Sequence, residues 1–231
     1  MKVNFIDLKQ RYIEEKNDLQ KIINKTLKSG NLVLTPEIEE FEKKICKYVK
    51  SKYCVSLNSG TDALMLSLWS LGIKKGDEVI TSPISFIATA GAIAHVGAIP
   101  KFVDVNYDLN INVELIEKKI TKKTKAIMPV HWTGRICEMN KINKIAKKYN
   151  IPVIEDSAQA MGSYYKNVHG GTFGKIGIFS AHPLKNLNAI GDSGFLVTNN
   201  KNIYKKIRTY RNHGLVARDD VSFFGVNSRM D

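Results

Sequence analysis

The sequence has few cysteines and few histidines, and none of them stand at metal-ligand spacing. The five histidines are dispersed, and neither an H-E-x-x-H nor a C-x-x-C motif occurs in the 231 residues, so we expect no metal site. The three cysteines, Cys46, Cys54 and Cys137, are odd in number and follow no secretory signal. This pattern predicts reduced, mostly buried thiols in a cytoplasmic protein.

Long apolar runs are also absent. Residues 1–7 lack the uninterrupted apolar segment and the small-residue cleavage site of a signal peptide. The longest weakly polar run, residues 86–100, is rich in Ala and Gly, is interrupted by His95 and is too short to span a bilayer. This run is better interpreted as a buried helix, and we expect no membrane partner.

Acidic residues are outnumbered, which leaves a formal net charge of +13. A charge of this sign admits nucleic-acid binding, which would appear as salt-sensitive retention on DNA. However, only six of the 35 basic residues are Arg, and no basic run is interleaved with aromatic residues. The lysines fall mainly on polar helix faces. We therefore expect a solvated surface, no nucleic-acid partner and a positive field that favours an anionic small substrate.

The chain does contain an alternation of short strand patterns and helix patterns, in a composition of 43% hydrophobic and 25% charged residues. Its length suffices for one sizeable α/β domain. Such alternation predicts a mostly parallel central sheet with helices on both faces. The expected helices cover residues 9–28, 36–49, 61–71, 86–96, 113–120, 139–149 and 203–211. The expected strands cover residues 53–57, 78–81, 101–105, 126–130, 153–155, 176–179 and 195–198.

The last part of the sequence breaks this alternation. Residues 212–231 are polar and irregular, and they carry no terminating helix or tail. We therefore interpret the sequence as a chain that ends in mid-fold.

Lys185 and Asp156 are the most informative pair of residues, because each follows an expected strand. A lysine amine can form a Schiff base with a carbonyl cofactor, and a carboxylate at a strand end can hold a pyridinium nitrogen protonated. Pyridoxal phosphate needs both groups, one at each end of its ring. Taken alone, Lys185 also fits a solvated surface lysine, and Asp156 also fits an acid that caps a turn.

Two stretches offer groups for a phosphate. Gly60 and Thr61 follow a strand and open a helix, where a glycine and free N–H groups suit a phosphate, and the hydroxyl of Ser180 is the second candidate. The alternative for residues 58–61 is an ordinary helix N-cap that binds nothing. The glycine-rich residues 170–174 are a weak phosphate-loop signal, because they lack the downstream acid of a dinucleotide fold.

Further candidates surround these residues in the sequence. Phe86, at the start of a helix, can stack on a flat ring or pack in the core. His131 ends a strand and can face the same pocket, while His182, three residues before Lys185, fits a structural role as well as a catalytic one. The loop at residues 191–194 can turn tightly around a bound group.

In their order and spacing, these motifs resemble the sugar aminotransferases of the DegT/DnrJ/EryC1/StrS family over nearly the whole chain. The motifs that carry the resemblance are Asn58-Ser59-Gly60-Thr61-Asp62-Ala63-Leu64, Pro129-Val130-His131, Glu155-Asp156-Ser157-Ala158-Gln159-Ala160, Phe179-Ser180, Lys185-Asn186-Leu187, Gly191-Asp192-Ser193-Gly194, Arg211-Asn212-His213-Gly214 and Asn227-Ser228-Arg229-Met230. The resemblance implies the large domain of a fold-type I pyridoxal-phosphate enzyme over residues 1–231, with an N-terminal helical segment at about 1–50. It implies that the family's small C-terminal domain is missing from this chain.

The resemblance also implies a role for each matching residue. Lys185 matches the Schiff-base lysine, and Asp156 matches the acid that pairs with the pyridinium nitrogen. Gln159 matches the residue beside the ring hydroxyl. The remaining matches are the phosphate-binding positions Gly60, Thr61 and Ser180, the ring-stacking Phe86, and Asn227, which would reach the cofactor phosphate of a partner subunit. Active sites would then be shared in a homodimer.

The activity that the resemblance implies is transfer of an amino group, with glutamate as donor, to a nucleotide-linked keto-sugar, in surface-polysaccharide or amino-sugar biosynthesis. Two alternatives stay open. One is a regulatory protein or inactive truncated homologue that binds pyridoxal phosphate or a sugar nucleotide without turnover. The other is a pyridoxal-phosphate-dependent sugar dehydratase. In that relative a histidine replaces the Schiff-base lysine, so the presence of Lys185 favours amino transfer. Lys175 and Ala181 depart from the family pattern and bear on the choice of substrate.

Overall fold

A central sheet organises the chain, whose computed structural model describes residues 6–230. A three-stranded part and a four-stranded part are joined edge to edge by parallel bridges between Ile127 and Val153 and between Val130 and Asp156. In spatial order the strands are β3 (Ile99–Phe102), β2 (Glu78–Thr81), β4 (Thr124–Met128), β5 (Ile154–Asp156), β8 (Ile176–Ser180), β9 (Gly194–Thr198) and β1 (Tyr53–Leu57). Only β9 runs antiparallel to its neighbours in this sheet, so the expected mostly parallel α/β sheet is confirmed.

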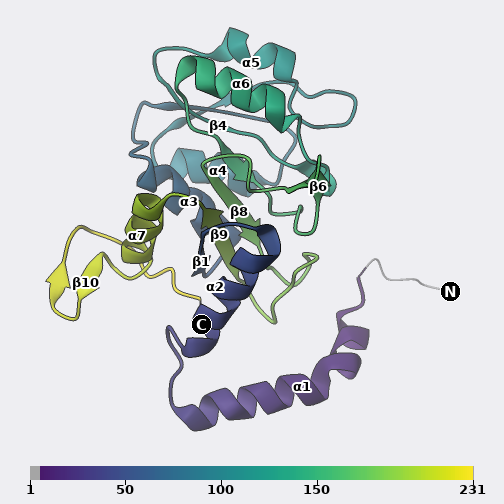
Figure 1. The fold of residues 1–231 in the computed structure, drawn as a ribbon, viewed down its shortest axis with the longest axis vertical. Helices are drawn as coiled ribbons and strands as arrows, with labels where there is room; N and C mark the ends of the chain where they lie inside the picture. The colour runs from purple at the N-terminus through teal and green to yellow at the C-terminus, as the bar shows by residue number, and fades with distance from the viewer. Residues whose placement is uncertain (1–5, 231) are drawn as a thin grey trace.

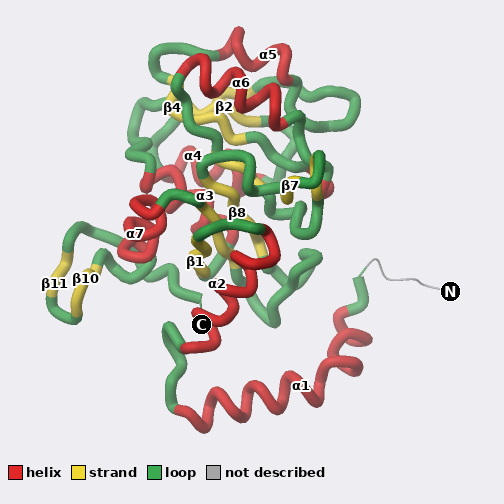
Figure 2. Tube along the Cα trace, in the orientation of Figure 1, coloured by secondary structure: helices red, strands yellow, loops and turns green. Residues whose placement is uncertain are grey.

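Most of the helices pack against this sheet, whereas α1 extends away from it (Figures 1 and 2). Their bounds are α1 (Leu8–Ser29), α2 (Pro36–Val49), α3 (Gly60–Ser70), α4 (Ile87–His95), α5 (Val113–Lys119), η1 (Trp132–Gly134), α6 (Met139–Tyr149) and α7 (Lys201–Tyr210). The N-terminal helical segment expected at about 1–50 is therefore α1 and α2, and its first five residues lie outside the described residues. None of the helices in the described part is long and apolar enough to cross a membrane.

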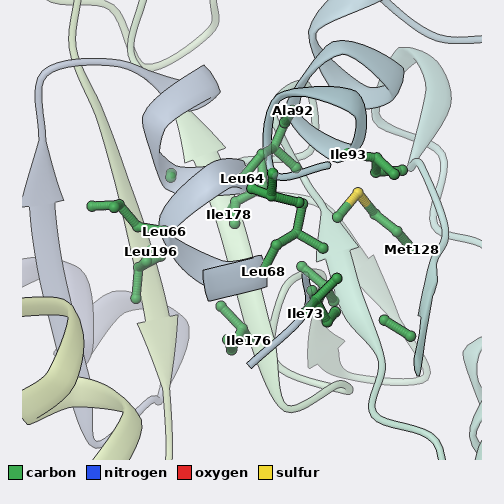
Figure 3. Packing of buried hydrophobic residues seen from close by; sticks show 14 of the residues in the cluster. Leu64, Leu66, Leu68, Ile73, Ala92, Ile93, Met128, Ile176, Ile178 and Leu196 are labelled. Atoms are coloured by element: carbon green, nitrogen blue, oxygen red, sulfur yellow. The ribbon is translucent and has the colours of Figure 1, made fainter. Parts of the chain in front are cut away.

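Side chains along the strands alternate between two apolar layers. Ile176, Ile178 and Leu196 face α3, α4 and α7 in the larger layer (Figure 3). Phe179 and Phe195, each next to one of these residues in its strand, point to the opposite face of the sheet and stack there beneath α2. On the same face, Ile127 and its neighbours lie beneath α5 and α6. Each fully buried aliphatic side chain contributes about 1.5–3 kcal/mol to stability, so both faces of the sheet hold the fold together, as expected for helices on both faces.

Two parts of the chain differ from the sequence-based expectation. Residues 212–231 were expected to be irregular, but the structure forms a short hairpin there, β10 (Leu215–Ala217) and β11 (Asp220–Val221), although residue 231 lies outside the described part. A second hairpin, β6 (Tyr164–Tyr165) and β7 (Val168–His169), was not expected either. Both are too short for alternating hydrophobicity to reveal them. In addition, β3 ends at Phe102 rather than running to Val105.

The direction of the strands decides where a site can form. Because β1 and β8 are both antiparallel to β9, they run parallel to each other and to β5. Their carboxyl ends therefore meet at one edge of the sheet, where ligands of such folds bind. At this edge the last residues of β1 and β8, Leu57 and Ser180, both pair with Gly194, the first residue of β9.

A buried ion pair ties the outer strand to two helices. The Arg211 guanidinium donates to Glu42 Oε1 over 2.7 Å and to the Ser56 carbonyl over 2.8 Å, and both charged side chains are buried. Glu42 Oε1 also accepts from the Ser56 backbone N–H and hydroxyl, each over 2.9 Å. One carboxylate oxygen thus links α2, β1 and the end of α7.

We predict that Glu42→Gln destabilises the protein by about 3–5 kcal/mol, because the change leaves the Arg211 charge buried without its partner. Urea unfolding of the full chain measures this loss. The matched control is Glu37→Gln, which breaks the exposed pair between Glu37 and Lys25 and should leave the unfolding midpoint unchanged. Equal effects of the two substitutions would contradict a structural role for the buried pair.

Candidate active site

A pocket of about 290 Å³ opens at the edge where the carboxyl ends of β1, β5 and β8 meet. Most of the residues selected from the sequence line it. These are Gly60, Thr61, Phe86, Asp156, Gln159, Ser180 and Lys185, together with His131, His182 and Asp192. Residues separated by more than a hundred positions in the chain are therefore neighbours in one cavity.

One end of the pocket is built by a close approach of three backbone segments. A Cβ atom added to Gly194 would lie 2.4 Å from the Gly60 nitrogen, and one added to Gly60 would lie 2.9 Å from the Ser180 Cβ. Only residues without a Cβ fit at positions 60 and 194, so both glycines are required by packing. This packing holds the start of α3 against the Ser180 hydroxyl.

The start of α3 presents backbone donors to this end of the pocket. The Ser59 hydroxyl caps the helix by accepting from the Asp62 N–H over 3.1 Å. The N–H groups of Gly60 and Thr61 belong to the first turn, which has no acceptor within the helix, and no other acceptor for them occurs among residues 6–230. Free N–H groups at a helix start, beside a serine hydroxyl, are suited to a phosphate.

Asp156, at the end of β5, lies buried at another wall of the pocket. Its Oδ2 accepts from the Thr89 hydroxyl over 2.7 Å, and its Oδ1 accepts from the Ala158 N–H over 3.2 Å. Burial raises the pKa of the Asp156 carboxyl, while these two hydrogen bonds and the nearby charges of His131 and Lys185 act in the opposite direction. The Asp156 carboxylate and Lys185 line the same pocket.

Lys185 is held by a tight turn after β8. The Lys185 N–H donates to the His182 carbonyl over 2.8 Å, and the Leu184 N–H donates to His182 Nδ1 over 3.1 Å. The His182 N–H in turn donates to Ser180 Oγ over 3.3 Å. His182 is therefore the structural centre of the turn, and the Ser180 hydroxyl keeps its own proton available for a ligand.

Gln159 and Phe86 complete the wall and the mouth of the pocket. Gln159 Oε1 accepts from the Thr133 N–H over 2.9 Å, which leaves its NH₂ group free to donate into the cavity. Phe86 is the N-cap residue of α4 and is 68% exposed. It does not pack in the core, so the alternative of a core phenylalanine is wrong, and its ring is accessible at the pocket.

Sequence reasoning missed two residues next to the pocket. Glu155, with its side chain fully buried, accepts from His131 Nε2 over 2.9 Å and from the Gly171 N–H over 2.8 Å. The weak phosphate-loop signal at residues 170–174 is therefore a loop that binds Glu155. Thr89 was also missed, although it lies three residues after Phe86, on the same side of a helix.

Asn227 is the one selected residue that does not line the pocket. It is exposed and pairs with Asn212 through an antiparallel bridge next to the β10–β11 hairpin. Within one chain it therefore lies outside the pocket lining. Its role toward a partner subunit stays a prediction.

The other sequence-based predictions near the site concern thiols and metals. Cys54 and Cys137 are buried, Cys46 is half-buried, and none of these forms a disulfide. Burial raises the pKa of the Cys54 and Cys137 thiols. Within residues 6–230, no group of three or more His, Cys, Asp or Glu side chains is arranged to hold a metal ion.

The open sheet with one antiparallel strand, the carboxylate at the end of β5 and the lysine in the turn after β8 agree with the fold that the resemblance implied, that of fold-type I pyridoxal-phosphate enzymes. Residues 13–231 match the family model described as the DegT/DnrJ/EryC1/StrS aminotransferase family. The chain belongs to this family, as its motifs suggested.

Three similar proteins illustrate the relationship. UDP-2-acetamido-2-deoxy-3-oxo-D-glucuronate aminotransferase of Pseudomonas aeruginosa is 39% identical over 99% of this chain and 64% of its own length. The pleiotropic regulatory protein of Geobacillus stearothermophilus is 37% identical over 100% of this chain and 62% of its own length. The crystal structure of NtdA from Bacillus subtilis with bound cofactor PMP superposes with a TM-score of 0.94 at 34% identity, covering 99% of this chain and 53% of that one. The chain therefore spans less than two thirds of the length of these relatives.

The pocket fits the cofactor that the family implies. The free N–H groups of Gly60 and Thr61 match a phosphate, and the cradle around them exists only because residues 60 and 194 lack side chains. A buried carboxylate, Asp156, and an amine, Lys185, complete the donor and acceptor set that a pyridinium ring with a carbonyl substituent requires.

We predict that Gly194→Ala weakens binding of pyridoxal phosphate at least tenfold and lowers thermal stability by about 1–3 kcal/mol, the usual cost of overpacking. The added methyl group would push the Gly60 amide out of the cradle. Fluorescence titration with the cofactor and thermal unfolding measure the two effects.

The control for this substitution is Gly191→Ala in the same loop, where an added Cβ meets nothing within 4 Å. It should bind the cofactor as the unmodified protein does. If both variants bind equally well, the cradle at position 194 does not hold the phosphate.

Proposed function

We propose that this chain is the large, cofactor-binding domain of a pyridoxal-phosphate-dependent aminotransferase that aminates a nucleotide-linked keto-sugar. The observation that carries the proposal is the convergence of Lys185, Asp156 and the Gly60–Thr61 amides in one pocket. The names of related proteins support the substrate class, since the Pseudomonas aeruginosa relative is an aminotransferase of a UDP-linked oxo-sugar. Surface-polysaccharide or amino-sugar biosynthesis is the corresponding context.

When bound, the cofactor supplies a carbonyl that condenses with amines and a ring that takes up the electron pair left by proton removal. Asp156 holds a proton at the ring nitrogen through its negative charge. Lys185 Nζ would be the amine that holds the cofactor carbonyl, and as a free amine it would act as general base and acid toward the proton of the bound amino donor. Gly60, Thr61 and Ser180 bind the phosphate, which keeps the reacting carbon aligned with Lys185.

The remaining selected residues orient the cofactor and shield it. The free NH₂ group of Gln159 donates to the ring hydroxyl, and the accessible ring of Phe86 stacks on the cofactor and excludes water. Asn227 reaches the phosphate of a partner subunit's cofactor in a homodimer with shared sites. We further propose glutamate as the amino donor and the cytoplasm as the location.

We predict that borohydride reduction fixes pyridoxal phosphate covalently to the protein at Lys185, and that Lys185→Ala abolishes this attachment. Mass spectrometry of tryptic peptides locates the adduct. The control is Lys175→Ala, which removes an exposed lysine just before β8 and should leave the adduct unchanged. An adduct that persists in Lys185→Ala would rule out the assignment.

A regulatory protein that binds the cofactor without turnover is the second candidate, because one relative of 37% identity is a pleiotropic regulatory protein. Amine transfer from glutamate to UDP- or dTDP-linked keto-sugars, assayed with the full-length protein, separates the two. Covalent cofactor at Lys185 without transfer to any keto-sugar would favour the regulatory protein. Loss of a sugar hydroxyl without amination would instead favour a dehydratase.

A further inference from the structure

Both oxygens of the Asp156 carboxylate have a donor within the protein. The Ala158 N–H reaches Oδ1 from the turn that follows β5, and the Thr89 hydroxyl reaches Oδ2 from α4. Thr89 is only 2% exposed, so its hydroxyl has no competing bond to bulk water. The bond of 2.7 Å lies within the usual range of a hydrogen bond from a hydroxyl to an oxygen acceptor.

A second hydroxyl lies behind this bond. Ser85 Oγ is 2.6 Å from Thr89 Oγ1, one turn earlier in the sequence. An ionised carboxylate only accepts hydrogen bonds, and a threonine hydroxyl has one proton. If that proton is donated to Asp156, the Ser85 hydroxyl must donate to Thr89. The chain from Ser85 through Thr89 to Asp156 therefore has one direction when Asp156 is an anion.

We propose that Thr89 is a positioning residue that holds the Asp156 carboxylate ionised and in one orientation, and that Ser85 fixes the direction of that bond. The relevance to catalysis rests on the proposed function, in which Asp156 faces the ring nitrogen. The hydrogen-bond chain itself involves only residues of this protein.

The surroundings of Asp156 explain why such a residue is needed. Burial is the largest influence on the Asp156 carboxyl and raises its pKa, and the Thr89 hydrogen bond is the largest influence that lowers it. Two titratable groups near Asp156 also lower its pKa, His131 in the segment between β4 and η1 and Lys185 in the turn after β8, and both act more weakly than Thr89. The Thr89 hydroxyl thus lowers the pKa of Asp156 more than any other side chain does and favours its ionised form.

The protonation state of Asp156 decides what this residue can do toward a cofactor ring. A protonated Asp156 has no negative charge that could hold a proton at a ring nitrogen. Its carboxyl would also carry an O–H donor of its own, which could take the place of the Thr89 hydroxyl as the donor of the hydrogen bond between the two residues. Because Thr89 donates to Oδ2 and Ala158 to Oδ1, rotation of the carboxylate is restricted as well. One hydroxyl on α4 therefore controls both the charge and the direction of the group that the cofactor ring meets.

The test compares Thr89→Val, which replaces the hydroxyl by a methyl group of similar size, with Thr89→Ser, which keeps the hydroxyl. The full chain is labelled with ¹³C-carboxyl aspartate, freed of cofactor and titrated by NMR, with Asp156→Asn to assign the signal. We expect the Asp156 titration midpoint to move to higher pH in Thr89→Val and to return in Thr89→Ser. This readout requires neither a bound cofactor nor activity.

A second variant is needed if Thr89→Val does not fold, which circular dichroism would reveal. In that case Ser85→Ala is decisive, since it removes the outer hydroxyl and should produce a smaller shift in the same direction. With the cofactor added, Thr89→Val should bind pyridoxal phosphate about tenfold more weakly than Thr89→Ser, which is the effect of one hydrogen bond to a charged group.

An unchanged Asp156 midpoint in folded Thr89→Val, or in Ser85→Ala if Thr89→Val does not fold, would overturn the proposal. The proposed function would survive that result, provided that Lys185 still forms the borohydride-fixed adduct. Conversely, a shifted midpoint in a protein that forms no adduct would retain the role of Thr89 toward Asp156 and reject the function.

Discussion

The site depends on one packing constraint, the contact between Gly60, Ser180 and Gly194 at the carboxyl edge of the sheet. The antiparallel strand β9 starts at this edge and lies between β1 and β8, whose last residues pair with its first. Because two of the three residues lack a Cβ, helix α3 can begin directly against the end of β8. The backbone donors and the serine hydroxyl then face one pocket, and the turn that carries Lys185 continues from Ser180.

A second set of polar contacts sets the charge in the pocket. Asp156 and Glu155 are adjacent on β5 but point to different partners, since successive strand residues face opposite sides of a sheet. Glu155 binds His131 and the loop at residues 170–174, whereas Asp156 meets Thr89 and the cavity. A buried structural carboxylate and a pocket carboxylate are thus neighbours in the chain, and the side of the sheet that each faces gives them different hydrogen-bond partners.

Several chemical features of the site were predictable because they depend on local sequence order. Lys185, Asp156, Gly60, Thr61 and Ser180 each follow a strand signal, and the carboxyl ends of parallel strands share an edge. Thr89 and Glu155 were not predictable in the same way. A threonine in a helix and an acid in an apolar strand carry no signal of their partners, which are brought to them by residues distant in the chain.

The sequence by itself determined the alternation of helices and strands, the absence of metal-ligand motifs and the ordered motifs that identify the family, because periodicity and motif spacing are local properties. The tertiary structure alone decided that Phe86 is accessible, that the glycines at 170–174 bind Glu155 and that Asn227 lies outside the pocket of its own chain. The physical reason is that burial and hydrogen-bond partners are set by contacts between distant segments. Such contacts exist only once β5, β8 and β9 have paired.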